Sequence, residues 1–276
     1  SAAILLCRFT GCSKTRMIVT NILNIPDELC TKRTDKFISW PGMCIEDAID
    51  RADQHADAIV LIHSHPGGML SFSTADDESD SCTMPALFSA IEADEFHHGS
   101  AIMVSDGSIK ARLYDANGQS QSVKRIKRVG YNIANLSKLG SQHVMPFGSE
   151  MTKTFAEQTA CVIGVSGTGT LVAELLARKG VGHLILIDFD TIELKNLNRI
   201  VNSTIIDAEH NRPKVEMMAA AIKRYSPDTR VTIINASIEE REAVIAASAA
   251  DILFSCVDSM AGRSIAELIC RCCVIP

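Results

Sequence analysis

The chain has 276 residues and a formal net charge of −6 at pH 7. Such an acidic chain lacks the basic surface that nucleic acid or an anionic membrane would attract, so we expect neither as a partner. We find no signal-peptide pattern and no apolar run long enough to span a bilayer. The length predicts two domains. The ten cysteines have no framework spacing, which predicts free thiols in a reducing, cytoplasmic compartment.

Residues 1–123 predict a mixed sheet with helices, an α/β domain. Short apolar runs indicate strands and helical spacing indicates the helices. We expect strands at residues 3–7, 17–25, 58–62, 101–105 and 109–113, and helices at residues 45–56 and 75–93. Pro85 predicts a break in the second helix. Trp40, the single tryptophan, predicts a core or interface anchor.

A group of potential metal ligands follows the buried strand at residues 58–62. His63 and His65 are two residues apart, so in extended chain they lie on one face. Ser73 has the position of a helix N-cap, and the turn before it can bring Asp76 back towards the histidines. Two imidazoles and one carboxylate leave a fourth position for water, as in a catalytic zinc site. The alternative is a pair of surface histidines beside a helix cap.

The complete spacing, His-x-His-x7-Ser-x2-Asp, resembles the signature of the JAMM (MPN/JAB) metalloproteases. The resemblance implies that His63, His65 and Asp76 bind Zn²⁺ and that Ser73 stabilises the tetrahedral intermediate. It also implies cleavage after the C-terminal glycine of a ubiquitin-like protein. The proton-shuttling glutamate of that family precedes the first strand. Its place here corresponds to Ser1 or the residue before it, and Ser1 is not a glutamate.

Three other groups of residues indicate a structural role and not a catalytic or metal-binding one. The adjacent side chains of His97 and His98 diverge, so we expect them on the surface. Cys270 and Cys273 have a Cys-x-x-Cys spacing without a second pair, which favours a helix interior over a zinc knot. A short basic run followed by a stretch of low periodicity predicts a linker at residues 124–157.

Residues 158–276 alternate strands and helices, which predicts a Rossmann-like parallel sheet with helices on both faces. We expect strands at residues 159–163, 184–187, 231–235 and 252–256, and helices at residues 171–179, 212–225 and 239–249.

A glycine-rich turn joins the first strand and helix of this domain, with Gly164, Gly167 and Gly169. Glycines let the backbone approach a phosphate, and the helix N-terminus supplies free N–H groups. Asp188 ends the next strand, where an acid suits ribose hydroxyls. An NAD-dependent oxidoreductase would have the same features up to this point.

Further charged and amide side chains follow at Asp188, Asp190, Asn196, Arg199, Lys214 and Asp258. Together with the glycine turn they resemble the E1-like adenylating enzymes, the ThiF/MoeB/HesA family. The resemblance implies that ATP and Mg²⁺ bind here, with Asp188 on the ribose and Asp258 on Mg²⁺. It implies that Asn196, Arg199 and Lys214 contact the triphosphate. Ser166 stands where that family usually has glycine.

The two resemblances together predict a JAMM isopeptidase fused to an E1-like domain. One half would cleave after the C-terminal glycine of a ubiquitin-like protein, and the other would adenylate the carboxylate. Such fusions occur in bacterial ubiquitin-like conjugation systems, some of them antiviral. Two alternatives stay open: activation of a sulfur carrier, and an impaired scaffold that binds a ubiquitin-like or E2-like partner. The resemblance also implies a homodimer through the second domain.

Overall fold

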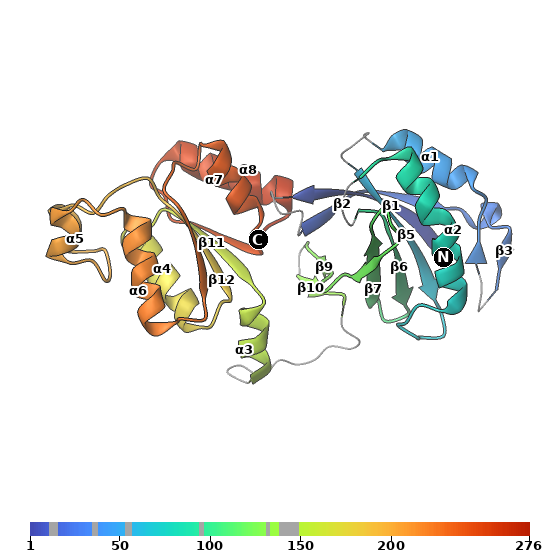
Figure 1. The fold of residues 1–276 in the computed structure, drawn as a ribbon, viewed down its shortest axis with the longest axis horizontal. Coiled ribbons are helices and arrows are strands. Elements are labelled where there is room, and N and C mark those ends of the chain that lie inside the picture. Colours follow the sequence, from blue (N-terminus) through green and yellow to red (C-terminus); the bar gives the residue numbers. More distant parts are fainter. Residues whose placement is uncertain (11–15, 35–37, 53–56, 94–96, 131–132, 138–148) are drawn as a thin grey trace. The chain divides into compact units, whose positions relative to one another are not determined.

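The computed structural model describes residues 1–10, 16–34, 38–52, 57–93, 97–130, 133–137 and 149–276. The chain divides into two compact units, residues 1–9 with 17–142 and residues 10–16 with 143–276. Each unit is α/β, with a mixed sheet in the first and a parallel sheet in the second, as predicted (Figure 1). One of the boundaries between the units, after residue 142, falls inside residues 124–157, where the linker was predicted. Of that range, residues 131–132 and 138–148 lie outside the described residues.

The N-terminal unit is built around one large sheet and two helices. Its elements are β1 (Ala2–Thr10), β2 (Arg16–Ile25), η1 (Asp27–Leu29), β3 (Lys32–Arg33), β4 (Ile38–Ser39), α1 (Met43–Arg51), β5 (Asp57–His65), α2 (Thr74–Ala90), β6 (Gly99–Val104), β7 (Ile109–Tyr114), β8 (Ser120–Ser122), β9 (Lys127–Arg128) and β10 (Ala134–Asn135). The large sheet has the order β2-β1-β5-β6-β7-β8. Strand β5 runs antiparallel to its neighbour β1 and parallel to its other neighbour β6, which makes the sheet mixed.

The core of this unit lies between the sheet and the two helices. Ile59 and Leu61 of β5 pack in one cluster with Ala48 of α1 and Leu87 of α2, and Trp40 packs against that cluster. The alternate β5 residues belong to a smaller cluster on the other face. Helix α2 continues through Pro85, where the sequence predicted a break. Proline removes one helical N–H, and burial of the neighbouring helix residues against the sheet offsets that loss.

The paired histidines differ from the prediction, because they are buried and not on the surface. His98 has no exposed area, and its ring is satisfied on both sides. Nδ1 accepts a hydrogen bond from the Ile59 amide at 3.0 Å, and Nε2 donates to the Ile91 carbonyl at 3.2 Å. The two bonds tie β5 to the end of α2, so this histidine is a structural core residue.

The C-terminal unit is a parallel sheet between helices. Its elements are α3 (Ser149–Ala156), β11 (Thr159–Ile163), α4 (Gly167–Arg178), β12 (His183–Ile187), η2 (Leu194–Asn196), α5 (Ile205–Glu209), α6 (Lys214–Tyr225), β13 (Arg230–Ile234), α7 (Arg241–Ser248), β14 (Ile252–Ser255) and α8 (Met260–Cys273). The strand order is β13-β12-β11-β14, and every pair is parallel. Cys270 and Cys273 lie in α8, as the helical interpretation predicted.

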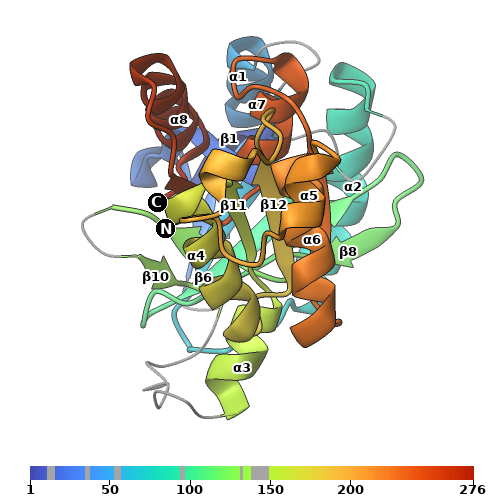
Figure 2. The ribbon, with the colours of Figure 1, turned by 90° about the vertical axis from the view of Figure 1, so that its left-hand side faces the viewer.

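Helices cover both faces of this sheet, with α4 and α6 on one side and α7 and α8 on the other (Figures 1 and 2). Strand β11 lies between β12 and β14: the chain runs outward from β11 through β12 to β13 and then crosses to β14 on the other side of β11. In open α/β sheets a ligand crevice forms at the carboxyl ends of the strands beside such a switch point. Among the helices of the described ranges, none combines the length and apolar character needed to cross a bilayer.

Candidate functional site

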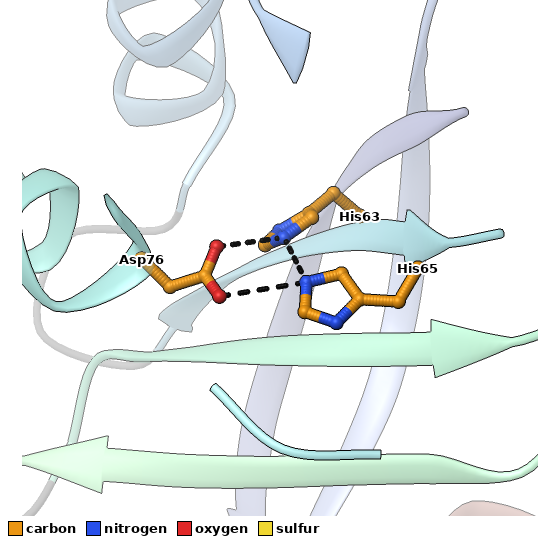
Figure 3. Close-up of side chains that lie close together, drawn as sticks. All are labelled: His63, His65 and Asp76. Atoms are coloured by element: carbon orange, nitrogen blue, oxygen red, sulfur yellow. Dashed lines mark hydrogen bonds and ion pairs between the residues drawn. The ribbon is translucent and has the colours of Figure 1, made fainter. Parts of the chain in front are cut away.

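Two histidines at the end of β5 and one aspartate near the start of α2 point at a common centre (Figure 3). Because side chains alternate along a strand, His63 and His65 continue the face of β5 that carries Ile59 and Leu61. That face is the one on which α2 packs. The pairing of strand and helix therefore places Asp76 opposite the two rings.

The distances between the donor atoms suit a metal ion. The two histidine Nε2 atoms are 3.1 Å apart. Asp76 Oδ1 is 3.0 Å from His63 Nε2, and Asp76 Oδ2 is 3.4 Å from His65 Nε2. A tetrahedral zinc with bonds of about 2.0–2.2 Å keeps its ligand atoms roughly 3.3–3.6 Å apart. The three side chains thus have nearly the spacing of zinc ligands, and their chemistry fits the predicted set.

The backbone fixes which nitrogen of His65 is free to bind a metal. Nδ1 of His65 lies 3.1 Å from the Met69 carbonyl oxygen. A carbonyl only accepts hydrogen bonds, so Nδ1 carries the proton and the neutral ring keeps its lone pair on Nε2. Metal-binding histidines commonly donate their second N–H to a carbonyl in this way.

A capping box holds Asp76 in place. The Ser73 amide and hydroxyl donate to Asp76 Oδ2 at 2.6 and 2.8 Å, and the Asp76 amide donates back to Ser73 Oγ at 3.3 Å. Burial alone would raise the pKa of Asp76, but the bonds from Ser73 and the nearby histidines outweigh it, so the pKa lies below the usual value. Asp76 is therefore a carboxylate at neutral pH. The Ser73 hydroxyl, predicted to stabilise an oxyanion, is directed at this ligand.

Burial also keeps His63 neutral. Its pKa is lowered because the ring is removed from water, and the attraction of Asp76 offsets this only in part. Metal binding requires an unprotonated imidazole nitrogen. At neutral pH the site therefore presents an unprotonated His63 ring and the Asp76 carboxylate.

A cleft of about 1030 Å³ opens beside the three donors. Its walls include Ser1, Arg33, Trp40, Met69, Ser71 and Ser100. Ala2 pairs with His63, and the Ser64 amide donates to the Ser1 carbonyl at 2.9 Å. Position 1, where the resemblance implies a glutamate at or just before it, thus lies at the wall of this cleft.

In the C-terminal unit, the glycine turn is closely packed. Gly164 has a φ of +87°, and a Cβ there would lie 2.9 Å from the Cys256 carbonyl. A Cβ on Gly169 would lie 1.8 Å from the Gly164 carbonyl oxygen. Gly167 has more room, because its nearest neighbours are Arg199 side-chain atoms at 3.5 Å. Ser166 is the N-cap of α4 with a φ of −107°, so its backbone does not require glycine.

Two acids after β12 join this turn to α6. Asp188 is buried, and its carboxylate accepts from the Val165 amide at 2.6 Å and the Asp190 amide at 2.8 Å. Burial is the main cause of its raised pKa, which these bonds and Lys214 counteract in part. Lys214, also buried, donates to Asp190 Oδ2 at 2.6 Å. The glycine turn, Asp188 and Lys214 are thus linked through Val165 and Asp190.

The remaining predicted residues occupy the same edge of the sheet with different partners. Asn196 is buried and accepts from the Glu193 amide at 3.0 Å. Arg199 packs on Gly167 and donates to the Lys195 carbonyl at 3.2 Å. Asp258 is exposed after β14.

Sequence reasoning assigned no role to Asp190 or to the Met69 carbonyl. The Asp-x-Asp spacing after a strand is a signal that could have identified Asp190. The Met69 carbonyl is a backbone group, and no side-chain pattern identifies it.

Residues 140–275 match the ThiF family. The chain is 30% identical over 130 residues to the molybdopterin-synthase adenylyltransferase of Escherichia coli K12, covering 47% of this chain and 51% of that protein. It is 31% identical over 126 residues to the ubiquitin-like modifier-activating enzyme 5 of Bombyx mori, covering 42% of this chain and 31% of that protein.

Among solved structures, the chain is similar to the E. coli tRNA N6-threonylcarbamoyladenosine dehydratase, with 29% identity and a TM-score of 0.44 over 47% of this chain and 53% of that one. The chain spans about half or less of the length of these relatives. The family match lies in the part of the sequence that carries the parallel sheet and the glycine turn. Residues 140–275 therefore form a ThiF-type, E1-like adenylating domain.

Proposed function

We propose that the C-terminal unit uses ATP to adenylate the carboxyl terminus of a ubiquitin-like or sulfur-carrier protein. The ThiF match carries this proposal. The relatives named above include an adenylyltransferase and a ubiquitin-like modifier-activating enzyme. A carboxylate oxygen of the tail would attack the α-phosphate of ATP, forming the acyl-adenylate and releasing pyrophosphate.

The residues at the carboxyl edge of the sheet suit this reaction. The packed glycine turn and the N-terminus of α4 offer backbone N–H groups to phosphate. Asp188 would bind the ribose, and Asp258 would hold Mg²⁺. Lys214 and Arg199 would neutralise phosphate charge as the two anions approach each other. Asn196 would complete the triphosphate contacts.

The test is ATP–pyrophosphate exchange with the full chain and a ubiquitin-like protein ending in glycine. We expect exchange that depends on the tail and on Mg²⁺. Exchange that ignores the tail would reject the proposed substrate. NAD(H) binding with no exchange would favour the oxidoreductase alternative.

We further infer that the N-terminal unit is a zinc-dependent hydrolase. The observation that carries this is the convergence of His63, His65 and Asp76 within a cleft. These residues would hold the ion with its fourth position open. When bound, zinc would lower the pKa of its water to about 7, which makes a hydroxide nucleophile available at neutral pH.

The side chains around the ion have separate tasks. Asp76 balances part of the metal charge, and the Met69 carbonyl keeps the His65 ring oriented. Ser73 would turn its hydroxyl from Asp76 to the oxyanion of the tetrahedral intermediate. A glutamate at position 1 or just before it would move the proton from water to the leaving amine.

Two measurements test this activity. Metal analysis of the purified chain should find about one zinc per chain. Cleavage of a ubiquitin-like protein fused through its C-terminal glycine should then appear with Ser1→Glu or with a glutamate added upstream. Zinc binding without cleavage in both forms would favour the scaffold alternative, in which the chain only docks a ubiquitin-like or E2-like partner.

Both activities meet at one chemical group, the glycyl carboxylate. We propose that the hydrolase exposes this carboxylate and that the adenylating domain activates it. Both steps would belong to a bacterial ubiquitin-like conjugation pathway, and some pathways of this kind serve antiviral defence. A homodimer through the adenylating domain and a cytoplasmic location complete this proposal. The sulfur-carrier alternative predicts a thiocarboxylate at the tail, whereas conjugation predicts an amide to another protein. Mass spectrometry of the reacted tail separates the two.

A further inference from the structure

An arginine outside the metal site connects three points around Asp76. Arg112 lies on β7, and its side chain is only 13% exposed. It donates to Asp77 Oδ1 at 2.6 Å and to Asp80 Oδ2 at 2.7 and 3.0 Å. Its guanidinium carbon lies 3.8 Å from the centre of the Phe72 ring. Phe72, Asp77 and Asp80 lie on either side of Asp76 in the chain, so one side chain holds the entry loop and the first turns of α2.

Asp80 anchors this arrangement to the sheet. It is 5% exposed, and its Oδ2 atom also accepts from Tyr114 Oη at 2.9 Å and from Ser100 Oγ. Ser100 lies on β6 and Tyr114 on β7. Asp76 and Asp80 are four residues apart, so they lie on the same side of α2. The register between α2 and the sheet therefore depends on the group around Asp80.

That register decides where Asp76 meets the histidines. His63 and His65 are on β5, which pairs with β6, and β6 pairs with β7. A guanidinium is a rigid fork that can satisfy several acceptors in one plane and stack on a ring at the same time. Arg112 does both, and its partners within the described part of the chain do not include His63, His65 or Asp76.

We propose that Arg112 is a positioning residue for the metal centre, fixing Asp76 at ligand distance from the two histidines through Asp77, Asp80 and Phe72. The proposal rests on the zinc site inferred above. Arg112→Gln should lower zinc affinity 10–100-fold, the usual cost of losing a residue that orients a metal ligand. Arg112→Lys keeps the charge and loses the fork, so its affinity should lie between those of Arg112→Gln and the native chain.

Arg8→Gln is the matched control. Arg8 Nε donates to Asp57 Oδ1 at 2.7 Å, at the opposite end of β5 from the histidines. The Arg8→Gln substitution removes an arginine–aspartate contact from the same sheet and leaves the residues of α2 unchanged. We expect both glutamine variants to lose thermal stability, and only Arg112→Gln to lose zinc affinity in a competition assay with a chromophoric chelator.

A second readout needs no metal. The Asp77 amide donates to the Ser73 carbonyl at 3.1 Å and the Asp76 amide to Ser73 Oγ at 3.3 Å. In samples prepared with a chelator, hydrogen exchange at these two amides should accelerate at least about tenfold in Arg112→Gln and stay native in Arg8→Gln.

The outcomes separate the two ideas. Native zinc affinity and native exchange in both Arg112 variants would overturn the positioning role. A native chain that binds no zinc would reject the zinc site. In that case exchange still decides whether Arg112 fixes Asp76: faster exchange in both Arg112 variants supports it, and unchanged exchange refutes it.

Discussion

The two candidate sites differ in the partners that their side chains contact. In the N-terminal unit, the donor atoms of His63, His65 and Asp76 approach one another to 3.0–3.4 Å. In the C-terminal unit, the side chains predicted to meet ATP contact their own neighbours. Lys214 binds Asp190, and Arg199 binds the Lys195 carbonyl. The side chains of the first set converge on one point, whereas those of the second pair with neighbouring groups of the fold.

The difference follows from the ligands. A bare cation requires several lone pairs aimed at one point, and such a grouping is recognisable from geometry alone. A nucleotide brings its own charges, so lysine and arginine can exchange an internal partner for phosphate when it arrives. For the nucleotide site, the family match therefore carries more weight than the contacts of its side chains. The predictions below test this contrast.

The largest expected effect is the loss of zinc on removal of one histidine. His65→Ala leaves two protein ligands, and a structural zinc contributes about 10–16 kcal/mol through four ligands, so one ligand is worth roughly 2.5–4 kcal/mol. Zinc affinity should fall by a factor between about one hundred and one thousand. Elemental analysis after gel filtration should then find no stoichiometric zinc.

His210→Ala is the control for this variant. His210 is exposed in the C-terminal unit, with Nδ1 donating to the Ile206 carbonyl at 2.8 Å. It should keep full zinc occupancy. Full occupancy in His65→Ala would reject the assignment of His65 as a ligand.

The second prediction concerns the packing of the glycine turn. A methyl group on Gly169 would overlap the Gly164 carbonyl oxygen, so the turn must move. Gly169→Ala should lower the free energy of unfolding of the C-terminal unit by about 3 kcal/mol, the upper range for overpacking. Alkylation of Cys161, which is fully buried in β11, measures this unfolding by mass spectrometry. Gly167→Ala meets only ordinary contacts and should alkylate at the native rate. Equal rates in the two variants would contradict the packing argument.

Strand periodicity predicted most of the fold. The strand predicted at residues 159–163 is β11 to the residue. Strands β12 and β14 differ from the prediction by one residue at one end, and β13 differs by one residue at both ends. The prediction that His97 and His98 lie on the surface was wrong, because it was inferred only from the divergence of adjacent side chains. The burial of His98 depends on the Ile59 amide of β5, 39 residues away in the sequence, and on the Ile91 carbonyl at the end of α2.

The grouping of His63, His65 and Asp76 was predictable because these residues are close in sequence and their spacing implies one face of a strand followed by a helix cap. The group around Arg112 was not predictable from the sequence, because its members lie on α2, β6 and β7. Asp80 is four residues after Asp76 and shares its face of the helix. Nothing in the chain signals that this face meets an arginine 32 residues further on.

A third prediction uses the buried histidine of the N-terminal unit. Burial lowers the pKa of His98 to about 4, and its bond to Ile91 offsets this only in part. An unfolded histidine titrates near pH 6.5, so between about pH 4 and 6.5 the unfolded chain binds a proton that the folded chain lacks. The stabilisation is complete above about pH 6.5 and is lost as the pH falls. By pH 5 the loss should reach about 2 kcal/mol.

Trp40 packs against the core of this unit, so urea titrations followed by its fluorescence report the unit by itself. They should be run with a chelator, because zinc binding to His63 and His65 also depends on pH. His98→Gln, which can still accept from Ile59 and donate to Ile91, should remove this part of the pH dependence. The same slope in both proteins would show that His98 is not its source.

The smallest expected effect separates the two sites. Asp258 is exposed, so its removal should not change the free energy of unfolding. If it holds Mg²⁺, Asp258→Ala should weaken Mg²⁺-dependent ATP binding about tenfold, roughly 1.4 kcal/mol, and leave zinc content native. Asp228→Ala, an exposed aspartate just before β13 at the opposite edge of the sheet, should bind ATP normally. Calorimetric titration with and without Mg²⁺ measures the difference in ATP affinity.

A loss of ATP affinity that does not depend on Mg²⁺ would mean that Asp258 contacts the nucleotide directly. Native ATP affinity in Asp258→Ala would leave Asp188 and Asp190 as the stronger candidates for Mg²⁺ ligands. Asp190 already pairs with Lys214, so an ion bound there would have to release that lysine towards the phosphates.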